Sequence, residues 1–244
     1  MESHVGTPTN SPRQDGQDRT RPPPILLHYF CGRGRAEQCR WMLAATTEGE
    51  SWGNRELSAP EEFEELKKNG KLLYGQVPML EIDGLYLTQA QAIIRYLAAK
   101  HGLLGSTPQE AALCDMVAEG CLEFRGGLLS YPFNPVKVAT QQSLGLINKF
   151  CPIFEKMLGD NQYIAGSTSM TYADILLAEV LTGYEEVFPT AMEQHYPKLN
   201  ELRVRVCQAA SGIVNYLASG KRYPFPTGEA GSAYVHNVRA VLNG

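Results

Sequence analysis

No stretch of this chain approaches ~18 consecutive apolar residues, so no membrane span is predicted. The first ten residues lack the apolar segment of a secretory signal. Blocks of basic residues are also lacking, and 22 Lys and Arg against 26 Asp and Glu give a net charge of −4, which argues against nucleic-acid binding. The length of 244 residues and the hydrophobic fraction of 43% are typical of a globular protein with one or two domains.

The six cysteines form no Cys-x-x-Cys pair, and none has a neighbouring histidine at metal-ligand spacing. This pattern argues against a disulfide framework and a zinc site, and it is typical of free thiols in a reducing compartment. No acceptor sequence for an N-linked glycan occurs either. We therefore expect a soluble cytoplasmic protein that holds no metal.

The first 24 residues are poor in apolar side chains. Apart from prolines, only Met1 and Val5 are apolar there, and the prolines prevent regular backbone hydrogen bonding. We expect residues 1–24 to form a disordered N-terminal extension and the fold to begin at residue 25.

Residues 25–102 carry strand and helix signals in the order βαβαββα. Short apolar runs predict strands at 25–30, 51–57, 77–82 and 85–87, and helical patterns occupy 36–45, 58–68 and 89–101. Asp83-Gly84 between two apolar runs is a strong hairpin signal. A trans Pro78 would cost the next strand a ladder hydrogen bond, so we expect a cis Val77–Pro78 bond in a turn. These features predict a small mixed sheet with helices packed on it.

Two short motifs predict where helices begin. Ser58 and Glu61 form an S-x-x-E capping box for the helix that runs through residue 68. Thr171 and Asp174 form a variant of the same box ahead of a segment that is apolar nearly all round in its first half. Such a helix is expected at the centre of a bundle.

Strand signals disappear after residue 102. Residues 103–108 are linker-like, and residues 109–244 show helical spacing of apolar residues. We expect helices at 113–128, 147–157, 172–187, 199–210, 212–217 and 230–242, with Pro152 kinking the second of them. The sequence therefore predicts an α/β domain at 25–102 followed by an all-α domain at 109–244.

Two long segments, LLHYFCGRGRAEQCRWMLAA and QVPMLEIDGLYLTQAQAIIRYLAAKHGLLG, resemble the cytosolic glutathione S-transferases, in particular their alpha class. The resemblance runs from about residue 25 to the C-terminus and is strongest before residue 105. It implies a thioredoxin-like domain that binds glutathione, and an all-helical domain that carries the pocket for an electrophile. Glutathione would then be a co-substrate, with no permanently bound cofactor.

By this resemblance, Tyr29 and Arg35 are the catalytic residues. Tyr29 would donate a hydrogen bond to the sulfur of glutathione, and Arg35 would add a fixed positive charge. A thiol reacts as its thiolate, and lowering its pKa by ~2 units takes about 2.7 kcal/mol. One hydrogen bond to a charged acceptor contributes roughly 1.5–3 kcal/mol, so the Tyr29 hydroxyl nearly suffices.

The resemblance also implies a set of glutathione-binding residues: Tyr29, Lys67, Gln76, Val77, Pro78, Gln89, Ala90, Glu123 and Lys149. The Val77 backbone would pair with the cysteinyl backbone of glutathione as an added strand does. Glu123 and Lys149 would reach glutathione in the neighbouring subunit of a homodimer. Ala90 departs from the family, which has Thr or Ser there, and the lost hydroxyl predicts a weaker hold on the γ-glutamyl carboxylate.

The predicted electrophile pocket consists of apolar and small residues: Phe30, Gly34, Leu129, Ser130, Phe133, Tyr234, Val238 and Val241. Tyr74 aligns with an aromatic key that enters the partner subunit, whereas Gln91 replaces an arginine at the two-fold axis of the alpha class. The predicted reaction is addition of the glutathione thiolate to hydrophobic electrophiles. Reduction of organic hydroperoxides or isomerisation of a steroid or prostanoid would be side activities of the same thiolate.

Two alternatives remain open from the sequence. Cys31 lies at the corner where other transferase classes place a nucleophilic cysteine, and a helix N-terminus together with Arg35 would lower the pKa of its thiol. The second alternative is a non-catalytic protein that kept the fold and lost glutathione affinity at Ala90. Activity that survives Tyr29→Phe and is lost in Cys31→Ser would favour the cysteine mechanism.

Overall fold

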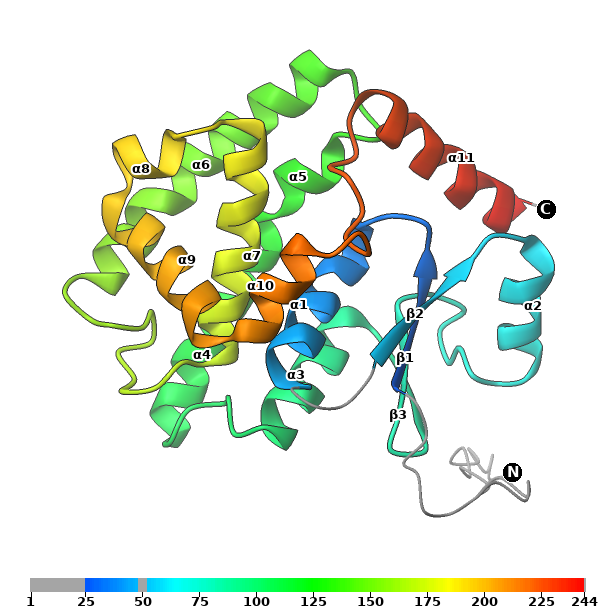
Figure 1. Cartoon of the computed structure of the whole chain (residues 1–244), viewed down its shortest axis with the longest axis horizontal. Helices are drawn as coiled ribbons and strands as arrows, with labels where there is room; N and C mark the ends of the chain where they lie inside the picture. Colours follow the sequence, from blue (N-terminus) through cyan, green and yellow to red (C-terminus); the bar gives the residue numbers. More distant parts are fainter. Residues whose placement is uncertain (1–24, 48–51, 244) are drawn as a thin grey trace, which may run out of the picture.

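A computed structural model describes residues 25–47 and 52–243. The expected N-terminal extension lies outside these residues. Two parts are visible in Figure 1, a small sheet with flanking helices and a larger group of helices. No helix in the described residues is both long and apolar enough to cross a membrane.

The first part follows the predicted order βαβαββα. Its strands are β1 (Ile25–Phe30), β2 (Trp52–Leu57), β3 (Met79–Ile82) and β4 (Leu85–Thr88). They form one mixed sheet in the order β2-β1-β3-β4, in which β1 and β2 are parallel and β3 is antiparallel to both β1 and β4. The peptide bond between Val77 and Pro78 is cis, which confirms the sequence prediction.

Helices cover both faces of this sheet. They are a short 3-10 turn η1 (Gly34–Ala36), α1 (Glu37–Thr46), α2 (Pro60–Lys68) and α3 (Ala90–Lys100). Helices α1 and α3 contact each other and the central helix of the second part, whereas α2 lies on the outer side of the sheet. The sheet therefore places the carboxyl end of β1 where the two parts of the molecule meet.

The capping box predicted for α2 starts one residue too early. The helix begins at Pro60, which favours the first helical position because it has no amide hydrogen to satisfy there. The carboxylate that caps the helix is therefore that of Glu62, which accepts hydrogen bonds from the backbone amides of Ser58 at 2.8 Å and Ala59 at 3.2 Å. The box at Thr171 is confirmed, because the Asp174 carboxylate accepts from the Thr171 amide at 2.8 Å.

The second part is helical throughout. Its helices are α4 (Pro108–Phe124), α5 (Gly126–Ser130), α6 (Val136–Leu158), α7 (Tyr172–Val187), α8 (Ala191–His195), α9 (Pro197–Ala209), α10 (Ser211–Ala218) and α11 (Gly228–Asn243). The single helix expected at 113–128 is divided at Arg125, before two glycines, and α8 was not predicted. Helix α6 contains Pro152 and begins earlier than expected, at Val136.

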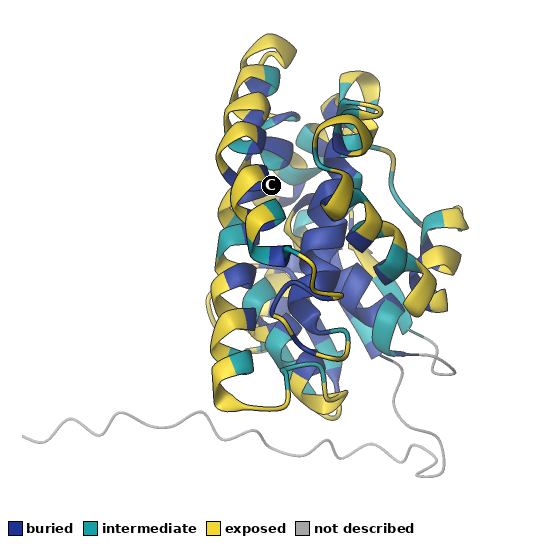
Figure 2. Cartoon of the chain, turned by 90° about the vertical axis from the view of Figure 1, so that its left-hand side faces the viewer, coloured by how far each residue is buried: buried dark blue, intermediate teal, exposed yellow. Residues whose placement is uncertain are grey.

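Burial follows the amphipathic pattern of the helices. Figure 2 shows buried residues on the inward faces and exposed residues on the outer faces. Helix α7 is buried on nearly every side in its first half, as its sequence predicts, and packs on α1, α4 and α9. Helix α11 instead leaves the helical part and returns to contact α2 and β1 (Figure 1).

Candidate active site

A cavity of about 660 Å³ lies between the two parts of the molecule. One side of its wall comes from the ends of β1 and α3 and from the loop ahead of β3, and the other side comes from α4, α5, α7 and α11. Apolar residues form much of the second side: Leu128, Leu129, Pro132, Phe133, Pro226, Val238 and Leu242. The cavity therefore joins a polar end in the sheet domain to an apolar end in the helical domain.

Tyr29 lies on this wall at the end of β1. Its ring is buried, and its hydroxyl oxygen accepts a hydrogen bond of 2.9 Å from the backbone amide of Arg35. Because that oxygen accepts from the amide, the hydroxyl proton is available for donation to a third group. The Arg35 side chain itself is exposed, so its contact with Tyr29 runs through the backbone of η1.

The hydroxyl of Tyr234, from α11, lies 3.1 Å from the hydroxyl of Tyr29. Two glycines allow this approach. A Cβ atom on Gly32 would lie 2.2 Å from the Tyr234 ring, and one on Gly34 would lie 2.4 Å from the Tyr29 hydroxyl. Burial, and secondarily the neighbouring Tyr29, raises the pKa of Tyr234, so its hydroxyl stays protonated and can donate.

The polar end of the cavity is formed by Gln76, Val77, Pro78, Gln89 and Ala90. Nε2 of Gln89 donates to Oε1 of Gln76 at 3.1 Å. Gln89 is the N-cap residue of α3, with φ of 72°, and it lines the cavity together with Ala90 and Gln91, so this eleven-residue helix begins at the cavity. A helix N-terminus presents unpaired N–H groups and favours a negatively charged group.

Lys67 lies beside the cavity rather than on its wall. Its side chain approaches Gly75, a wall residue, and its ammonium forms an ion pair of 2.6 Å with Glu64 on the same helix. Glu123 and Lys149 also lie off the wall, on α4 and α6, where they are exposed and paired with each other. Tyr74 is 62% exposed and protrudes from the loop ahead of β3.

Six of the eight predicted electrophile-pocket residues line the cavity: Phe30, Gly34, Leu129, Phe133, Tyr234 and Val238. The other two, Ser130 and Val241, do not lie on its wall. The Ser130 hydroxyl donates to the carbonyl oxygen of Gly127 within its own helix turn, and Val241 is buried on the inner side of α11. The next residue, Leu242, lies on the wall instead.

Arg125 and Glu179 are wall residues that the sequence reasoning missed. Their side chains are only 4% and 6% exposed, and Nε of Arg125 lies 3.1 Å from Oε2 of Glu179. Nη2 of Arg125 donates to the carbonyl oxygen of Gly34 at 2.6 Å. Burial raises the pKa of Glu179, and Arg125 opposes that effect. The sequence offered one indication of this ion pair: Glu179 is a charged residue within the apolar run of α7.

Cys31 does not have the lowered pKa that its position suggested. Its sulfur lies 3.7 Å from the Glu56 carboxylate and 3.9 Å from the Leu57 carbonyl oxygen. Burial, followed by the charge of Glu56, raises the pKa of this thiol. The expectation of an activated thiolate at Cys31 is therefore wrong, because an acid faces the sulfur and the Arg35 side chain does not pair with it.

An ion-pair network supports the site from behind. Glu37 of α1 pairs with Arg40 at 3.4 Å and with Arg222 at 3.1 Å. Arg222 also pairs with Glu186, which in turn pairs with Arg33 at 2.8 Å. Burial alone would raise the pKa of Glu37, but its arginine neighbours outweigh burial and lower it. The network ties α1 and α7 to the loop that leads into α11.

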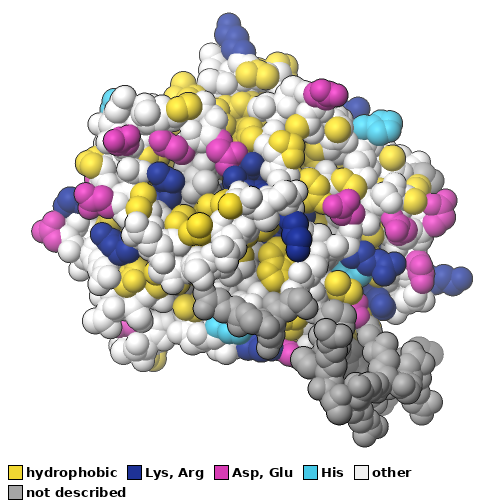
Figure 3. All heavy atoms as spheres, in the orientation of Figure 1, with side chains coloured by type: hydrophobic (Ala, Val, Ile, Leu, Met, Phe, Trp, Pro, Cys, Tyr) yellow, Lys and Arg dark blue, Asp and Glu magenta, His cyan; other side chains and the backbone are white. Residues whose placement is uncertain are grey.

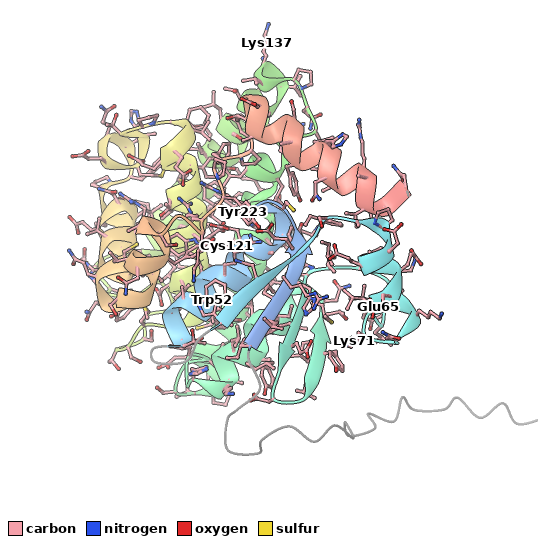
Figure 4. All side chains as sticks on the ribbon, turned by 45° about the vertical axis from the view of Figure 1, so that its right-hand side comes forward. Trp52, Glu65, Lys71, Cys121, Lys137 and Tyr223 are labelled. Atoms are coloured by element: carbon pink, nitrogen blue, oxygen red, sulfur yellow. The ribbon has the colours of Figure 1, made fainter. Side chains whose placement is uncertain are left out.

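The loop into α11 also contacts the sheet directly. The hydroxyl of Tyr223, labelled in Figure 4 beside the strands, donates to Glu56 of β2, and its backbone carbonyl accepts from Nε of Arg33 at 2.7 Å. These bonds fix the direction in which α11 starts. Elsewhere, on the face in Figure 3, acidic and basic side chains of the described residues are interspersed and form no large patch of one sign.

Two family models match the chain. The glutathione S-transferase N-terminal domain matches residues 26–99, and the glutathione S-transferase C-terminal domain matches residues 133–220. Glutathione S-transferase alpha-4 of Rattus norvegicus is 38% identical over 88% of this chain and 96% of that protein. Glutathione S-transferase alpha I of Oryctolagus cuniculus is 36% identical over 84% of this chain and 92% of that protein.

Solved structures agree with these matches. Rat hPGDS complexed with a quinoline superposes with a TM-score of 0.66 at 27% identity, covering 80% of this chain and 96% of that one. Monomeric Na-GST-3, a glutathione S-transferase from Necator americanus, gives a TM-score of 0.67 at 25% identity, covering 81% and 99%. The predicted architecture of a thioredoxin-like domain followed by a helical domain is thereby confirmed. This chain belongs to the glutathione S-transferase family, and its curated relatives are alpha-class members.

Proposed function

We propose that this protein is an enzyme that conjugates the thiol sulfur of glutathione to hydrophobic electrophiles, with Tyr29 as the residue that stabilises the thiolate. The observation that carries this proposal is the Tyr29 hydroxyl, which lies on the cavity wall and accepts the Arg35 amide at 2.9 Å. A hydroxyl group whose oxygen already accepts one hydrogen bond donates a stronger hydrogen bond to another group, because hydrogen bonds in a chain polarise one another. The thiolate of bound glutathione is the acceptor in this proposal.

Glutathione would lie along the polar end of the cavity. Its γ-glutamyl carboxylate fits the amides at the start of α3 beside Gln76 and Gln89, where the helix dipole favours an anion. Its cysteinyl backbone would pair with Val77, and its glycyl carboxylate would displace Glu64 as the partner of Lys67. This placement points the sulfur toward Tyr29 and the electrophile toward the apolar wall.

The proposed chemistry is displacement or addition by the thiolate. The thiol proton is released to solvent, the sulfur lone pair forms a bond to the electrophilic carbon, and the displaced electron pair leaves with the departing group or moves onto a conjugated atom. Reduction of organic hydroperoxides or a double-bond isomerisation would be side activities of the same thiolate. A thiol transferase based on Cys31 is disfavoured by the raised pKa of that thiol.

Calorimetry with glutathione, followed by conjugation of 1-chloro-2,4-dinitrobenzene, tests this function on wild type and Tyr29→Phe. We expect Tyr29→Phe to bind glutathione and to lose roughly 10- to 100-fold in kcat/KM, the equivalent of one charged hydrogen bond. Tyr86→Phe is the matched control, because it removes a tyrosine hydroxyl on β4 away from the cavity wall. No binding at millimolar glutathione would overturn the proposal in favour of a non-catalytic protein with the same fold.

We also propose that the protein acts in the cytoplasm as a homodimer. Tyr74 and its neighbour Leu73 are 62% and 66% exposed, and Met116 on α4 is 57% exposed, so these apolar side chains are accessible to a partner subunit. Glu123 and Lys149 would then contact glutathione bound to the neighbouring subunit. Sedimentation analysis of wild type and Tyr74→Ala tests this: a monomeric wild type, like Na-GST-3, would contradict the proposal.

A further inference from the structure

Arg125 is an unusual residue for the apolar end of the cavity. Removing a guanidinium from water is costly unless its donors are satisfied. The Arg125 side chain is 4% exposed, and its named contacts use Nε, toward Glu179, and Nη2, toward Gly34. Among the described residues, no acceptor is bonded to its third nitrogen, Nη1, although the residue lies on the cavity wall.

The position of Arg125 relative to the reacting groups is fixed by Gly34. The carbonyl oxygen of Gly34 accepts from Nη2 of Arg125 at 2.6 Å. A Cβ atom on the same glycine would lie 2.2 Å from the Tyr234 hydroxyl and 2.4 Å from the Tyr29 hydroxyl. Gly34 is therefore the residue that links the Arg125 guanidinium to the hydroxyls of Tyr29 and Tyr234.

Glu179 determines what kind of group Arg125 can bind. Its carboxylate oxygen Oε2 lies 3.1 Å from Nε of Arg125 and balances the charge of the guanidinium. A carboxylate guest would put two anions around one guanidinium, whereas a neutral oxygen needs only one free N–H donor. The surrounding wall is apolar, with Leu128, Leu129 and Phe133, so the rest of the guest must be apolar as well.

We propose that Arg125 is a further substrate-binding residue of the proposed transferase, and that it selects apolar electrophiles whose reacting carbon is conjugated to a neutral acceptor oxygen, such as a nitro oxygen. This inference rests on the proposed function. In the reaction with a chloronitroarene, the sulfur lone pair forms the carbon–sulfur bond and the ring π electrons move onto a nitro oxygen. Those electrons then return to the ring and chloride leaves with the carbon–chlorine pair, while the thiol proton has gone to solvent.

Arg125 would donate Nη1–H to the oxygen that takes up this charge. A donor held in place before the reaction, in a site with little water, stabilises the charged addition intermediate more than it stabilises the neutral substrate. Arg125 would therefore raise kcat for oxygen-bearing electrophiles more than for electrophiles without such an oxygen.

The test compares two electrophiles on one set of variants. 1-Chloro-2,4-dinitrobenzene carries conjugated acceptor oxygens, and 2-(chloromethyl)naphthalene carries none. We expect Arg125→Met to lower kcat/KM for the first electrophile by roughly 10- to 100-fold more than for the second, with the additional loss mainly in kcat, because any effect of the lost contact with Gly34 is common to both. Arg125→Lys keeps the charge, and we expect it to recover part of the lost rate.

Because Arg125→Met leaves the Glu179 carboxylate buried without its partner, the variant can fail to fold. The double variant Arg125→Met, Glu179→Gln restores the charge balance and is measured in parallel, with circular dichroism as the check on folding. Equal losses for both electrophiles, or no loss for either, would overturn the inference and leave the proposed transferase activity intact. A wild type that conjugates neither electrophile would overturn the proposed function, and the inference with it.

Discussion

The hydroxyl oxygens of Tyr29 and Tyr234 lie 3.1 Å apart, although 205 positions separate the two residues in the chain. Tyr29 is the last residue but one of the first strand and Tyr234 belongs to the last helix, so the hydrogen bond joins the two ends of the described fold. Because Tyr29 already accepts from the Arg35 amide, a second donation from Tyr234 would polarise its hydroxyl further.

Tyr234→Phe is therefore predicted to weaken the stabilisation of the thiolate without abolishing it. One neutral hydrogen bond contributes about 0.5–1.5 kcal/mol, which corresponds to a rise of roughly 0.4–1 unit in the pKa of bound glutathione. Titration of the thiolate by its ultraviolet absorbance measures this shift. Tyr29→Phe, measured in parallel, should give a larger rise; an equal or smaller one would contradict the assignment of Tyr29 as the direct donor.

Gly34→Ala should damage the site through a clash. The added methyl would lie 2.2 and 2.4 Å from the two tyrosine hydroxyls, at a backbone φ of +36°. Gly70→Ala is the matched control, since Gly70 has φ of +69° and nothing within 4 Å of its added Cβ. We expect Gly34→Ala to lose more than roughly tenfold in kcat/KM, and Gly70→Ala to lose only stability. Equal activity in the two variants would contradict the packing described for Gly34.

Ala90→Ser is predicted to bind glutathione more tightly. The serine hydroxyl would supply the hydrogen bond that the alanine lacks, beside the amides at the start of α3. A hydrogen bond to a charged group of roughly 1.5 kcal/mol corresponds to about a tenfold lower Kd. Calorimetry on the two proteins checks this, and an unchanged Kd would show that the γ-glutamyl carboxylate does not contact this position.

Arg222→Met should lower the free energy of unfolding by about 2–3 kcal/mol, because it leaves Glu37 and Glu186 with one cationic partner fewer in a buried network. Lys198→Met is the control: its pair with Asp160 is fully exposed, so we expect a much smaller loss than in Arg222→Met. Urea denaturation of both variants gives the comparison. Similar losses would mean that the network contributes no more than a surface ion pair.

His28 predicts a pH dependence of stability. Burial lowers the pKa of this histidine, with smaller effects in the same direction from Arg55 and Lys71, and outweighs the opposing Glu81 carboxylate 3.5 Å away. The unfolded chain then binds a proton more readily than the folded one, so stability falls as the pH drops below about 6.5. In His28→Gln, the loss of unfolding free energy between about pH 7.5 and 5.5 should be smaller. Parallel curves would contradict this prediction.

Local patterns in the sequence were enough to predict most of the fold. The order of strands and helices in the first part, the hairpin at Asp83-Gly84, the cis Val77–Pro78 bond and the buried start of α7 depend on neighbouring residues, and each was confirmed. The start of α2 was predicted one residue early because Pro60 competes with Ser58 in setting the first helical turn. The division between α4 and α5 escaped prediction because apolar spacing continues across Arg125.

The site was predictable only where the family resemblance fixed a residue. Tyr29, Gln76 and Gln89 line the cavity as expected, and the expected role of each remains to be measured. Arg125 and Glu179 come from helices that are distant in sequence, and their meeting depends on how α4 packs on α7. Burial, followed by the charge of Glu56 on β2, raises the pKa of Cys31, and spacing along the chain could not indicate either effect.

The position of helix α11 outside the helical bundle determines how easily its residues can be substituted during evolution. Only Gly231, Tyr234 and Val241 of its sixteen residues are buried, and it contacts α2 and β1 rather than the interior of the helical bundle. Leu242 lies on the cavity wall and is 51% exposed, so it can be exchanged without repacking either core. We therefore expect that substitutions at this end of the chain can alter the range of accepted electrophiles, while the folding stability of the scaffold and the position of Tyr29 on β1 stay unchanged.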